Sequence, residues 1–385
     1  MKYRRIFLVV LDSVGVGNAH DADKFNDKGA NTLLHTVNAD NIELPNLKKL
    51  GFLNLIGEKE NANSIYTVAN EVSNGKDTLT GHLEMMGVIT KKPFITYLDG
   101  FPNELIEKIE EISNRKVIGN INASGTEIIK NLGEEHMKTG SIIVYTSADS
   151  VLQIAAHEEV VPLEELYDIC SKVRELTKEG KYKVGRIIAR PFIGKNNDFK
   201  RTENRHDYAL DPASDTVLDY LKENFLDVIS IGKIADVFNN NGITETIKTK
   251  NNMDGILKII DTLDSDFEGL CFANLNDFDS LYGHRRNPIG YLNCLKQFDD
   301  NLDELLSRVG ENDLLILTAD HGNDPTFKGT DHTREQIPVL MYNQYFQKFG
   351  KIEDLKTFSD IGKTILDNFN IENDLPGDSF LDKIK

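Results

Sequence analysis

Residues 313–334 read DLLILTADHGNDPTFKGTDHTR and hold the most informative pattern in this chain. The run from Asp313 to Thr318 is short and apolar, which predicts a strand buried on both faces. Asp320 and His321 come just after it, and Gly322 favours a turn that lets two adjacent side chains face one point. Open α/β sheets bind ligands at the carboxyl ends of their strands. Asp320, His321 and the later His332 are therefore candidate ligands of a divalent metal.

Two other apolar runs also end in carboxylates. Ile6 to Leu11 is followed by Asp12, and Gly269 to Leu275 is followed by Asp279, with His284 five residues further on. Each motif alone has a structural alternative, namely a capping aspartate and histidines in solvent. All of these alternatives would have to hold together, because three separate strands in the first and last thirds of the chain end alike. The combination favours a shared metal site.

A threonine lies at the predicted start of a helix between residues 73 and 87. Leu79, Leu83 and Met86 have helical spacing, which puts Thr78 at or just before the helix N-terminus. Free backbone N–H groups and the positive end of the helix dipole can hold a phosphate there and favour an alkoxide. The alternative is a threonine that only caps the helix.

Composition limits the class of protein. The chain has 385 residues, 39% of them hydrophobic and 28% charged, which indicates an ordinary globular protein with two domains. A net charge of -18 argues against general affinity for nucleic acid or anionic membranes. No run approaches the roughly 18 apolar residues of a membrane helix. The three cysteines show no paired spacing, as expected of a cytoplasmic protein.

The middle of the chain lacks Asp-His pairs and holds a basic block instead. Between residues 183 and 205 seven basic residues face two acidic ones: Lys183, Arg186, Arg190, Lys195, Lys200, Arg201 and Arg205 against Asp198 and Glu203. Arginine suits a bidentate grip on phosphate, although a solvated basic face is the alternative. We predict a doubly wound α/β core sheet from residues 1–92 and 214–385, with an inserted α+β cap domain at 93–213.

The candidate ligands suffice for two metals. One set is Asp12, Asp320 and His321 with the Thr78 oxygen, and the other is Asp279, His284 and His332 with positions left open for substrate. Mixed carboxylate and imidazole sites accept Zn, Mn or Fe. Two divalent cations exceed the charge of three carboxylates, which suits in-line phosphoryl transfer.

These motifs resemble the alkaline phosphatase superfamily, and within it the prokaryotic phosphopentomutases. The resemblance covers nearly the whole chain, from the Asp12 strand through KDTLTGH at 76–82, TSADSV at 146–151, GRIIARPF at 185–192, RTENRHDY at 201–208 and DFD at 277–279 to ADHG at 319–322. It implies two Mn²⁺ ions on the two ligand sets above and Thr78 as the phosphoryl carrier. It also implies that Ser147, Arg186 and Arg201 face the sugar phosphate.

The resemblance implies a cytoplasmic isomerase of nucleoside catabolism. Such an enzyme interconverts α-D-ribose 1-phosphate, or 2-deoxyribose 1-phosphate, with the 5-phosphate through phosphothreonine and a bisphosphate. A sugar bisphosphate such as glucose 1,6-bisphosphate or ribose 1,5-bisphosphate would phosphorylate Thr78, and the inserted domain would exclude water as a lid. The alternatives are a metal-dependent phosphatase or a phosphoglycerate-mutase-like enzyme of the same superfamily. A metal or sugar-phosphate binding protein without activity is disfavoured, because binding alone requires no threonine at a helix N-terminus. The oligomeric state stays open.

Overall fold

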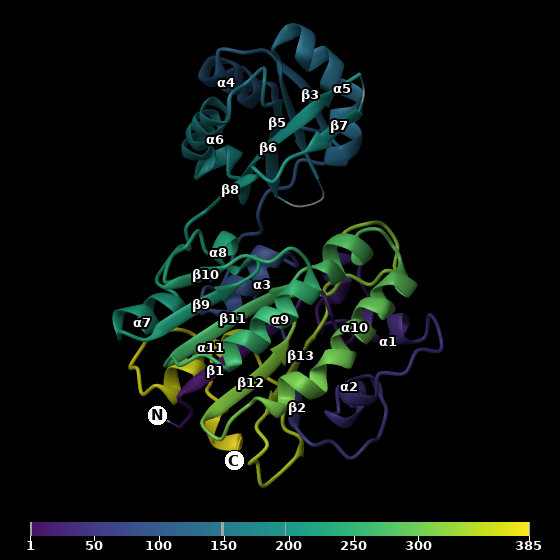
Figure 1. The fold of residues 1–385 in the computed structure, drawn as a ribbon, viewed down its shortest axis with the longest axis vertical. Coiled ribbons are helices and arrows are strands. Elements are labelled where there is room, and N and C mark those ends of the chain that lie inside the picture. Colours follow the sequence, from purple (N-terminus) through teal and green to yellow (C-terminus); the bar gives the residue numbers. More distant parts are fainter. Residues whose placement is uncertain (1, 148–149, 197, 385) are drawn as a thin grey trace. The chain divides into compact units, whose positions relative to one another are not determined.

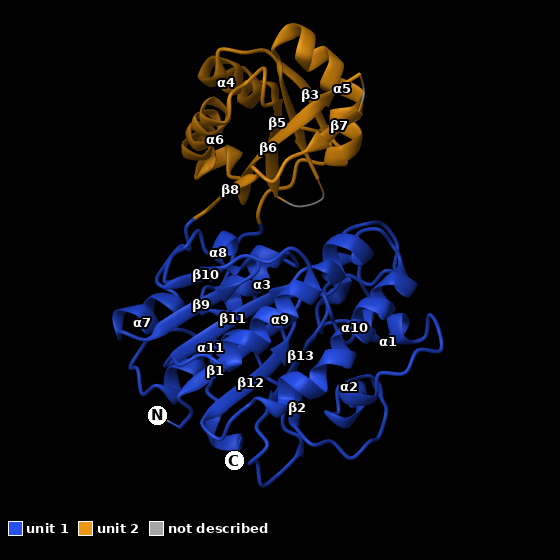
Figure 2. Ribbon diagram, in the orientation of Figure 1, with its two compact units in different colours: residues 1–93, 211–385 blue, residues 94–210 orange. Residues whose placement is uncertain are grey.

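A computed structural model describes residues 2–147, 150–196 and 198–384. The chain forms two compact units, shown in blue and orange in Figure 2. Unit 1 combines residues 1–93 with 211–385, and unit 2 comprises residues 94–210. The limits expected from the sequence, 93 and 213, differ from those of unit 2 by one and three residues. Two residues of the TSADSV motif, Ala148 and Asp149, lie outside the described residues.

Unit 1 is built on one mixed sheet. In spatial order its strands are β10 (Glu245–Ile247), β9 (Asp227–Ile231), β11 (Gly269–Leu275), β1 (Arg5–Leu11), β12 (Asp313–Thr318), β13 (Ile337–Tyr342), β2 (Ile65–Ala69) and β14 (Gly350–Lys351). Neighbouring strands from β10 to β12 pair in parallel, whereas β13 is antiparallel to both β12 and β2. The sheet therefore has a parallel half and a partly antiparallel half.

Helices cover the sheet of unit 1. They are α1 (Thr32–Val37), α2 (Pro45–Lys49), α3 (Thr78–Met85), α7 (Val217–Glu223), α8 (Ile234–Val237), α9 (Asn252–Leu263), α10 (Pro288–Ser307) and α11 (Ser359–Asn368). One group joins α9 and α10 with α1 and α2, and another joins α11 with α3 and α7. In Figure 1, α9 and α10 lie across the front of the sheet. Since every residue of β11 and β12 is buried, these strands need cover on both faces, as in a doubly wound sheet.

The register of the three central strands aligns their carboxyl ends. β1 pairs with β11 up to Leu11 opposite Leu275, and with β12 up to Val10 opposite Thr318. The residues that follow these strands therefore emerge at one edge of the sheet. This is the edge at which Asp12, Asp279 and Asp320 were predicted to meet.

Unit 2 has its own mixed sheet and its own core. The strand order is β3 (Val117–Asn122), β4 (Ile142–Thr146), β5 (Val151–His157), β6 (Arg186–Lys195) and β7 (Asp198–Arg201), and β8 (His206–Ala209) also pairs with β6. Alternate residues of β4 pack on opposite sides. Ile142 and Val144 join a cluster with α4 (Asn103–Ser113) and α6 (Leu163–Thr177), whereas Ile143 and Tyr145 join one with α5 (Gly125–Thr139).

Two strands contain prolines. No strand was predicted at 337–342, where β13 holds Pro338, although proline is rare in inner strands. Pro338 is tolerated because it lies just before the last residue pair with β12, Thr318 opposite Val339. β6 continues through Pro191. That proline falls between the last pair with β8, at Ala189, and the first pair with β7, at Phe192.

Candidate metal centre

The ends of β1 and β12 bring Asp12, Asp320 and His321 together. Ligand atoms of these three buried residues all lie within 4.8 Å of one another. Nε2 of His321 is 3.6 Å from Oδ1 of Asp12 and 3.3 Å from Oδ2 of Asp320. The other ring nitrogen of His321, Nδ1, donates to the Gly322 carbonyl at 3.0 Å, so Nε2 presents its lone pair to the two carboxylates.

A strained residue fixes the first of these strand ends. Ser13, directly after Asp12, has a φ of 69°, a left-handed conformation that is uncommon for residues other than glycine. In this conformation its N–H donates to Oδ1 of Asp320 at 3.0 Å, and its hydroxyl bonds to that of Tyr291. Local strain of this kind concentrates at functional sites, where surrounding contacts hold it in place.

A π-turn after β11 explains the spacing of Asp279 and His284. Residues Phe278–Gly283 form a π-helical turn, in which the His284 N–H donates to the Asp279 carbonyl five residues earlier. The two side chains meet, with Nε2 of His284 3.2 Å from Oδ2 of Asp279. Nε2 of His332 lies 3.4 Å from Oδ1 of Asp279 and 3.0 Å from Nε2 of His284. Asp279, His284 and His332 thus form a second cluster of candidate ligands.

His321 connects the two clusters. Its ligand atom also falls in a group with those of Asp279 and His332, all within 4.8 Å of one another. The centroids of the His321 and His332 rings are 4.0 Å apart. The prediction placed His321 in the first cluster only, because spacing along the chain does not show that the two histidine rings lie next to each other.

Thr78 stands beside the first cluster at the first position of α3, after the N-cap Asp77. Its Oγ1 lies 3.2 Å from Nε2 of His321. Gly81 makes this approach possible, since a Cβ there would come within 2.0 Å of the Asp320 carbonyl oxygen. Thr80 differs from Thr78, because its hydroxyl donates to Oδ2 of Asp77 at 2.6 Å as part of the helix cap.

Lys233, which the sequence analysis missed, completes the surroundings of Thr78. Its Nζ donates to Oγ1 of Thr78 at 3.2 Å and to Oδ1 of Asn276 at 3.1 Å, and it forms an ion pair with Oδ2 of Asp12. Lys233 follows β9 by two residues, at the same sheet edge as the aspartates. The rule that identified the aspartates, polar residues after buried strands, also applies to this lysine.

The loop that carries His332 is held by a buried arginine. Arg334 is 1% exposed and pairs with Asp21 and Glu71. It also donates to the Gly75 carbonyl at 2.5 Å, three residues before Thr78. Arg334 therefore ties the His332 loop to the segment that leads into α3.

The charges of the carboxylates influence one another strongly. Burial raises the pKa of Asp12, and the nearby Asp320 carboxylate raises it further. Burial would also raise the pKa of Asp320, but His321 and His82 outweigh it and lower this pKa. For Lys233, burial acts to lower the pKa, while Asp12, Asp320 and Asp279 outweigh burial and raise it. The lysine is therefore an ammonium ion next to Thr78.

The first cluster fits a divalent cation. Oδ2 of Asp12 accepts from Asn274 at 3.0 Å and Oδ1 of Asp320 accepts from Ser13, whereas the other oxygen of each carboxylate accepts no hydrogen bond among the described residues. Nδ1 of His82 lies 3.2 Å from Oδ2 of Asp320 but bonds to the Thr78 carbonyl at 2.8 Å. These two buried oxygens, Asp12 Oδ1 and Asp320 Oδ2, are the ones that face Nε2 of His321. Unpartnered buried anions are costly, and a metal ion would satisfy both.

The candidate substrate residues belong to unit 2. Arg186 is half-buried and pairs with the buried carboxylate of Asp207 at 3.2 Å, while Arg201 is exposed and donates to the Thr126 hydroxyl at 2.9 Å. Ser147 follows β4 and is half-buried. Arg186 and Arg201 lie on adjacent strands of one sheet, β6 and β7.

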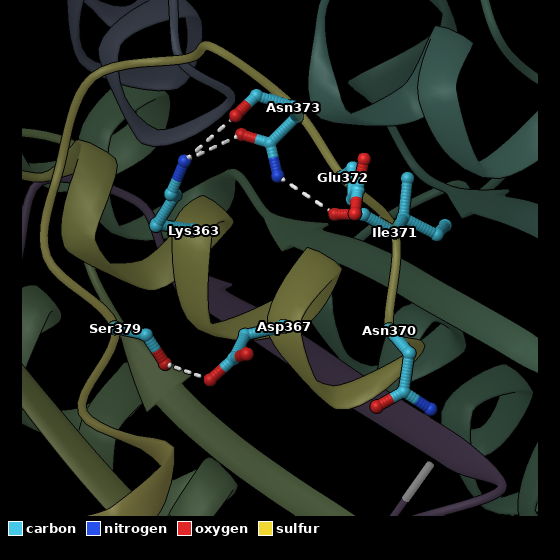
Figure 3. Close-up of a pocket in the computed structure, with 7 residues that line it drawn as sticks. All are labelled: Lys363, Asp367, Asn370, Ile371, Glu372, Asn373 and Ser379. Carbon is cyan, nitrogen blue, oxygen red and sulfur yellow. Dashed lines mark hydrogen bonds between the residues drawn. The ribbon is translucent and has the colours of Figure 1, made fainter.

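A depression lined by residues of α11 and the following segment lies elsewhere in unit 1 (Figure 3). Its polar side chains bind one another: Lys363 donates to Asn373, and Ser379 donates to Asp367. Nothing in it resembles the convergent ligand atoms of the metal centre.

Comparison with known protein families agrees with this chemistry. Residues 4–373 match the family model described as the metalloenzyme superfamily. The chain belongs to this superfamily. Its mixed sheet, covered by helices, confirms the predicted α/β fold class.

The solved structures that match this chain are distant in sequence. The PH0037 protein of Pyrococcus horikoshii is 14% identical, with a TM-score of 0.51 over 98% of this chain and 100% of that one. A phosphoglycerate mutase of Leishmania mexicana is 12% identical, with a TM-score of 0.49 over 98% and 97% of the two chains. The alkaline phosphatase of the Antarctic bacterium TAB5 is 13% identical, with a TM-score of 0.40 over 97% and 100%.

The described part of this metalloenzyme-superfamily chain contains no helix that is both long and apolar enough to span a membrane.

Proposed function

We propose that this protein is a phosphopentomutase that carries the phosphoryl group on Thr78. The observation that carries the proposal is the position of the Thr78 hydroxyl, at the first residue of α3 and 3.2 Å from both His321 Nε2 and Lys233 Nζ. A hydroxyl between a candidate metal ligand and an ammonium ion is suited to become a nucleophile, because the ammonium ion, and a metal ion held by His321, would favour its alkoxide.

The charges of the site suit a phosphate dianion. Three carboxylates, Asp12, Asp279 and Asp320, and the Lys233 ammonium leave two negative charges. Two divalent cations would turn these into two positive charges, which a transferring phosphoryl group balances. We propose Mn²⁺ on Asp12, Asp320 and His321 and on Asp279, His284 and His332. The ions would supply Lewis-acid stabilisation of the oxygens on either side of the phosphorus.

The proposed reaction moves phosphoryl groups between Thr78 and the sugar, and water is not a reactant. Phosphorylated Thr78 transfers its phosphoryl group to the C1 hydroxyl of a pentose 5-phosphate, so that the Oγ1–P bond breaks, an O1–P bond forms and the hydroxyl proton returns to Thr78. The resulting bisphosphate reorients in the site. Thr78 then takes the 5-phosphoryl group, and the C5 oxygen gains the proton. A sugar bisphosphate such as glucose 1,6-bisphosphate or ribose 1,5-bisphosphate phosphorylates the free enzyme.

We propose that the basic block of unit 2, residues 183–205, binds the other phosphate of the substrate. Arg186 and Arg205 share one carboxylate, Asp207, and Arg190 bonds to the neutral Gln153. Burial and the nearby Arg205 lower the pKa of Arg190 to about 10, as expected where arginines outnumber carboxylates. Arg201 and Ser147 complete the proposed substrate-binding residues. A doubly charged phosphate would relieve this excess of positive charge.

Product analysis tests the proposal. The Mn-loaded protein is incubated with ribose 5-phosphate and a trace of glucose 1,6-bisphosphate, and quenched samples are analysed by phosphorus NMR after the Mn²⁺ has been removed. We expect ribose 1-phosphate to appear without inorganic phosphate. Steady release of inorganic phosphate would instead identify a phosphatase of the same superfamily. Conversion of phosphoglycerates, with ribose 5-phosphate left intact, would show that the protein is a phosphoglycerate mutase.

A further inference from the structure

Two buried polar residues behind the metal centre have no role in the proposed reaction. His82, one turn after Thr78 on α3, is 0% exposed, and Asn274, the next-to-last residue of β11, is 2% exposed. The side-chain amide nitrogen of Asn274 lies 3.0 Å from Oδ2 of Asp12 and 3.3 Å from Nε2 of His82. The other ring nitrogen of His82 lies 2.8 Å from the Thr78 carbonyl oxygen and 3.2 Å from Oδ2 of Asp320.

The contacts of Asn274 determine one end of the imidazole. A carboxylate oxygen only accepts hydrogen bonds when ionised, so the NH₂ group of Asn274, and not its oxygen, must face Asp12. Its second N–H then faces Nε2 of His82, which must accept. Nε2 therefore carries no proton.

The contacts of the other ring nitrogen lead to the same result independently. Nδ1 of His82 faces a backbone carbonyl and a carboxylate oxygen, both of which are acceptors. Nδ1 must therefore carry the proton. Both ends of the ring require the same neutral tautomer, with hydrogen on Nδ1 and a lone pair on Nε2.

We propose that His82, in this Nδ1–H tautomer, and Asn274 are positioning residues that hold the nucleophile and the first metal site in register. Asn274 orients Asp12 by binding Oδ2, which leaves Oδ1 to face His321. His82 orients Asn274 through Nε2 and secures the first turn of α3 through the Thr78 carbonyl. Neither residue bonds to Oγ1 of Thr78 among the described contacts, whose partners are His321 and Lys233. The pair thus acts through its neighbours.

The inference deepens the proposed function and rests on it for the role of Thr78. The tautomer is measured without substrate, so the two can fail separately. Full-length protein labelled with ¹⁵N-histidine is observed by long-range ¹H–¹⁵N correlation, metal-free and loaded with diamagnetic Mg²⁺ or Zn²⁺. The His82 signals are assigned by their loss in His82→Asn. We expect the Nδ1–H pattern in both states; a ring protonated on Nε2, or on both nitrogens, overturns the proposal even if the protein is an active mutase.

Two substitutions test the contacts of the two ring nitrogens of His82 one at a time. The amide of asparagine replaces Nδ1, so His82→Asn retains a donor to the Thr78 carbonyl but loses the acceptor for Asn274. The amide of glutamine reaches the position of Nε2, so His82→Gln retains that acceptor but loses the donor. We expect His82→Asn to weaken binding of the first metal by about 10- to 100-fold, the effect typical of residues that orient metal ligands. His82→Gln should bind metal within about threefold of the parent protein, but accept a phosphoryl group on Thr78 about tenfold more slowly.

The coupling between the two residues gives an independent measurement. Asn274→Leu removes the contact that His82→Asn removes and also the contact with Asp12, so the double variant should lose no more metal affinity than Asn274→Leu alone. Metal affinity is measured by competition with a chelator, and thermal unfolding confirms that each variant is folded. Additive losses, or parent-like affinity in both single variants, contradict the proposal. If a variant fails to fold, the tautomer in the parent protein still decides.

Discussion

Nζ of Lys233 lies 3.2 Å from Oγ1 of Thr78 and also forms an ion pair with Asp12. The ammonium thus contacts both the proposed nucleophile and a proposed metal ligand. A cation in this position can stabilise the threonine alkoxide when phosphothreonine gives up its phosphoryl group, and then the oxygens of the group itself. It also occupies Oδ2 of Asp12, so that Oδ1 is the oxygen left for a metal.

Replacing Lys233 by glutamine tests this arrangement. Loss of one preorganised cation should lower kcat by about 10²- to 10³-fold. Metal affinity should be retained or increased, because Asp12 loses a competing cation. Steady-state kinetics and a metal titration of the same preparation check both expectations. Parent-level turnover in Lys233→Gln would show that the lysine only balances the charge of Asp12.

Removal of metal should abolish activity, and Mn²⁺ should restore it. Asp320→Ala should lose the first ion and at least about a hundredfold in turnover, because a metal supplies several kcal/mol of transition-state stabilisation. The matched control is Asp331→Asn, a half-exposed acidic residue next to His332 that pairs with Lys76 and is outside the ligand groups. The metal site is misassigned if the metal-free protein stays active or if Asp320→Ala still binds two ions and turns over.

The phosphoryl group should be found on Thr78 and not on Thr80. Thr78→Ala should eliminate both phosphoenzyme and mutase activity. In Thr80→Ala the phosphorylation should persist, but stability should fall by about 1.5–3 kcal/mol, since a hydrogen bond to the Asp77 carboxylate is lost. Mass spectrometry of peptides from protein incubated with a sugar bisphosphate locates the phosphate. A phosphate on Thr80 would overturn the assignment.

Arg201 and Arg186 should matter for pentose phosphates but not for small esters. Each substitution by alanine should lower kcat/KM for ribose 5-phosphate by about ten- to more than a hundredfold, because a charge-assisted hydrogen bond is lost. Hydrolysis of p-nitrophenyl phosphate, which has no second phosphate to bind, should stay at the parent level, as should metal affinity.

Lys200→Ala is the control for Arg201, since Lys200 is the neighbouring exposed cation and pairs with Asp198. Arg186→Ala also needs a stability measurement, because it leaves Asp207 with Arg205 as its pairing arginine. If both activities fall together, or if neither changes, these arginines do not bind the substrate.

The sequence predicted the strands whose ends carry the aspartates, because short apolar runs such as FLVVL and LLILT are typical of strands that are buried on both faces. It also placed Thr78 at a helix start, from the spacing of Leu79 and Leu83. It did not predict β13, whose Pro338 is acceptable only because of where pairing with β12 ends. Lys233 is one basic residue after a short strand, and its meeting with Thr78 is a tertiary contact between residues 155 positions apart. Likewise, only the π-turn shows why His284 follows Asp279 at a spacing of five.

His82 and Asn274 illustrate a further limit of sequence reasoning. His82 belongs to the KDTLTGH motif, but a motif does not indicate which ring nitrogen carries a proton. Asn274 lies inside an otherwise apolar strand, GLCFANL, and a buried amide there was a signal that it has a specific partner. Identifying that partner as Asp12 required the register of β1 with β11.

The fate of the phosphoryl group on Thr78 distinguishes transfer to the sugar from transfer to water. Protein phosphorylated by a sugar bisphosphate is purified, loaded with Mn²⁺ and mixed with one equivalent of ribose 5-phosphate, and the phosphorus products of a single turnover are quantified after quenching. We expect the phosphoryl group of Thr78 to move to ribose 1,5-bisphosphate and ribose 1-phosphate to follow, with inorganic phosphate near zero. Transfer of the Thr78 phosphoryl group to water at the same rate with and without ribose 5-phosphate would contradict the proposed mutase reaction.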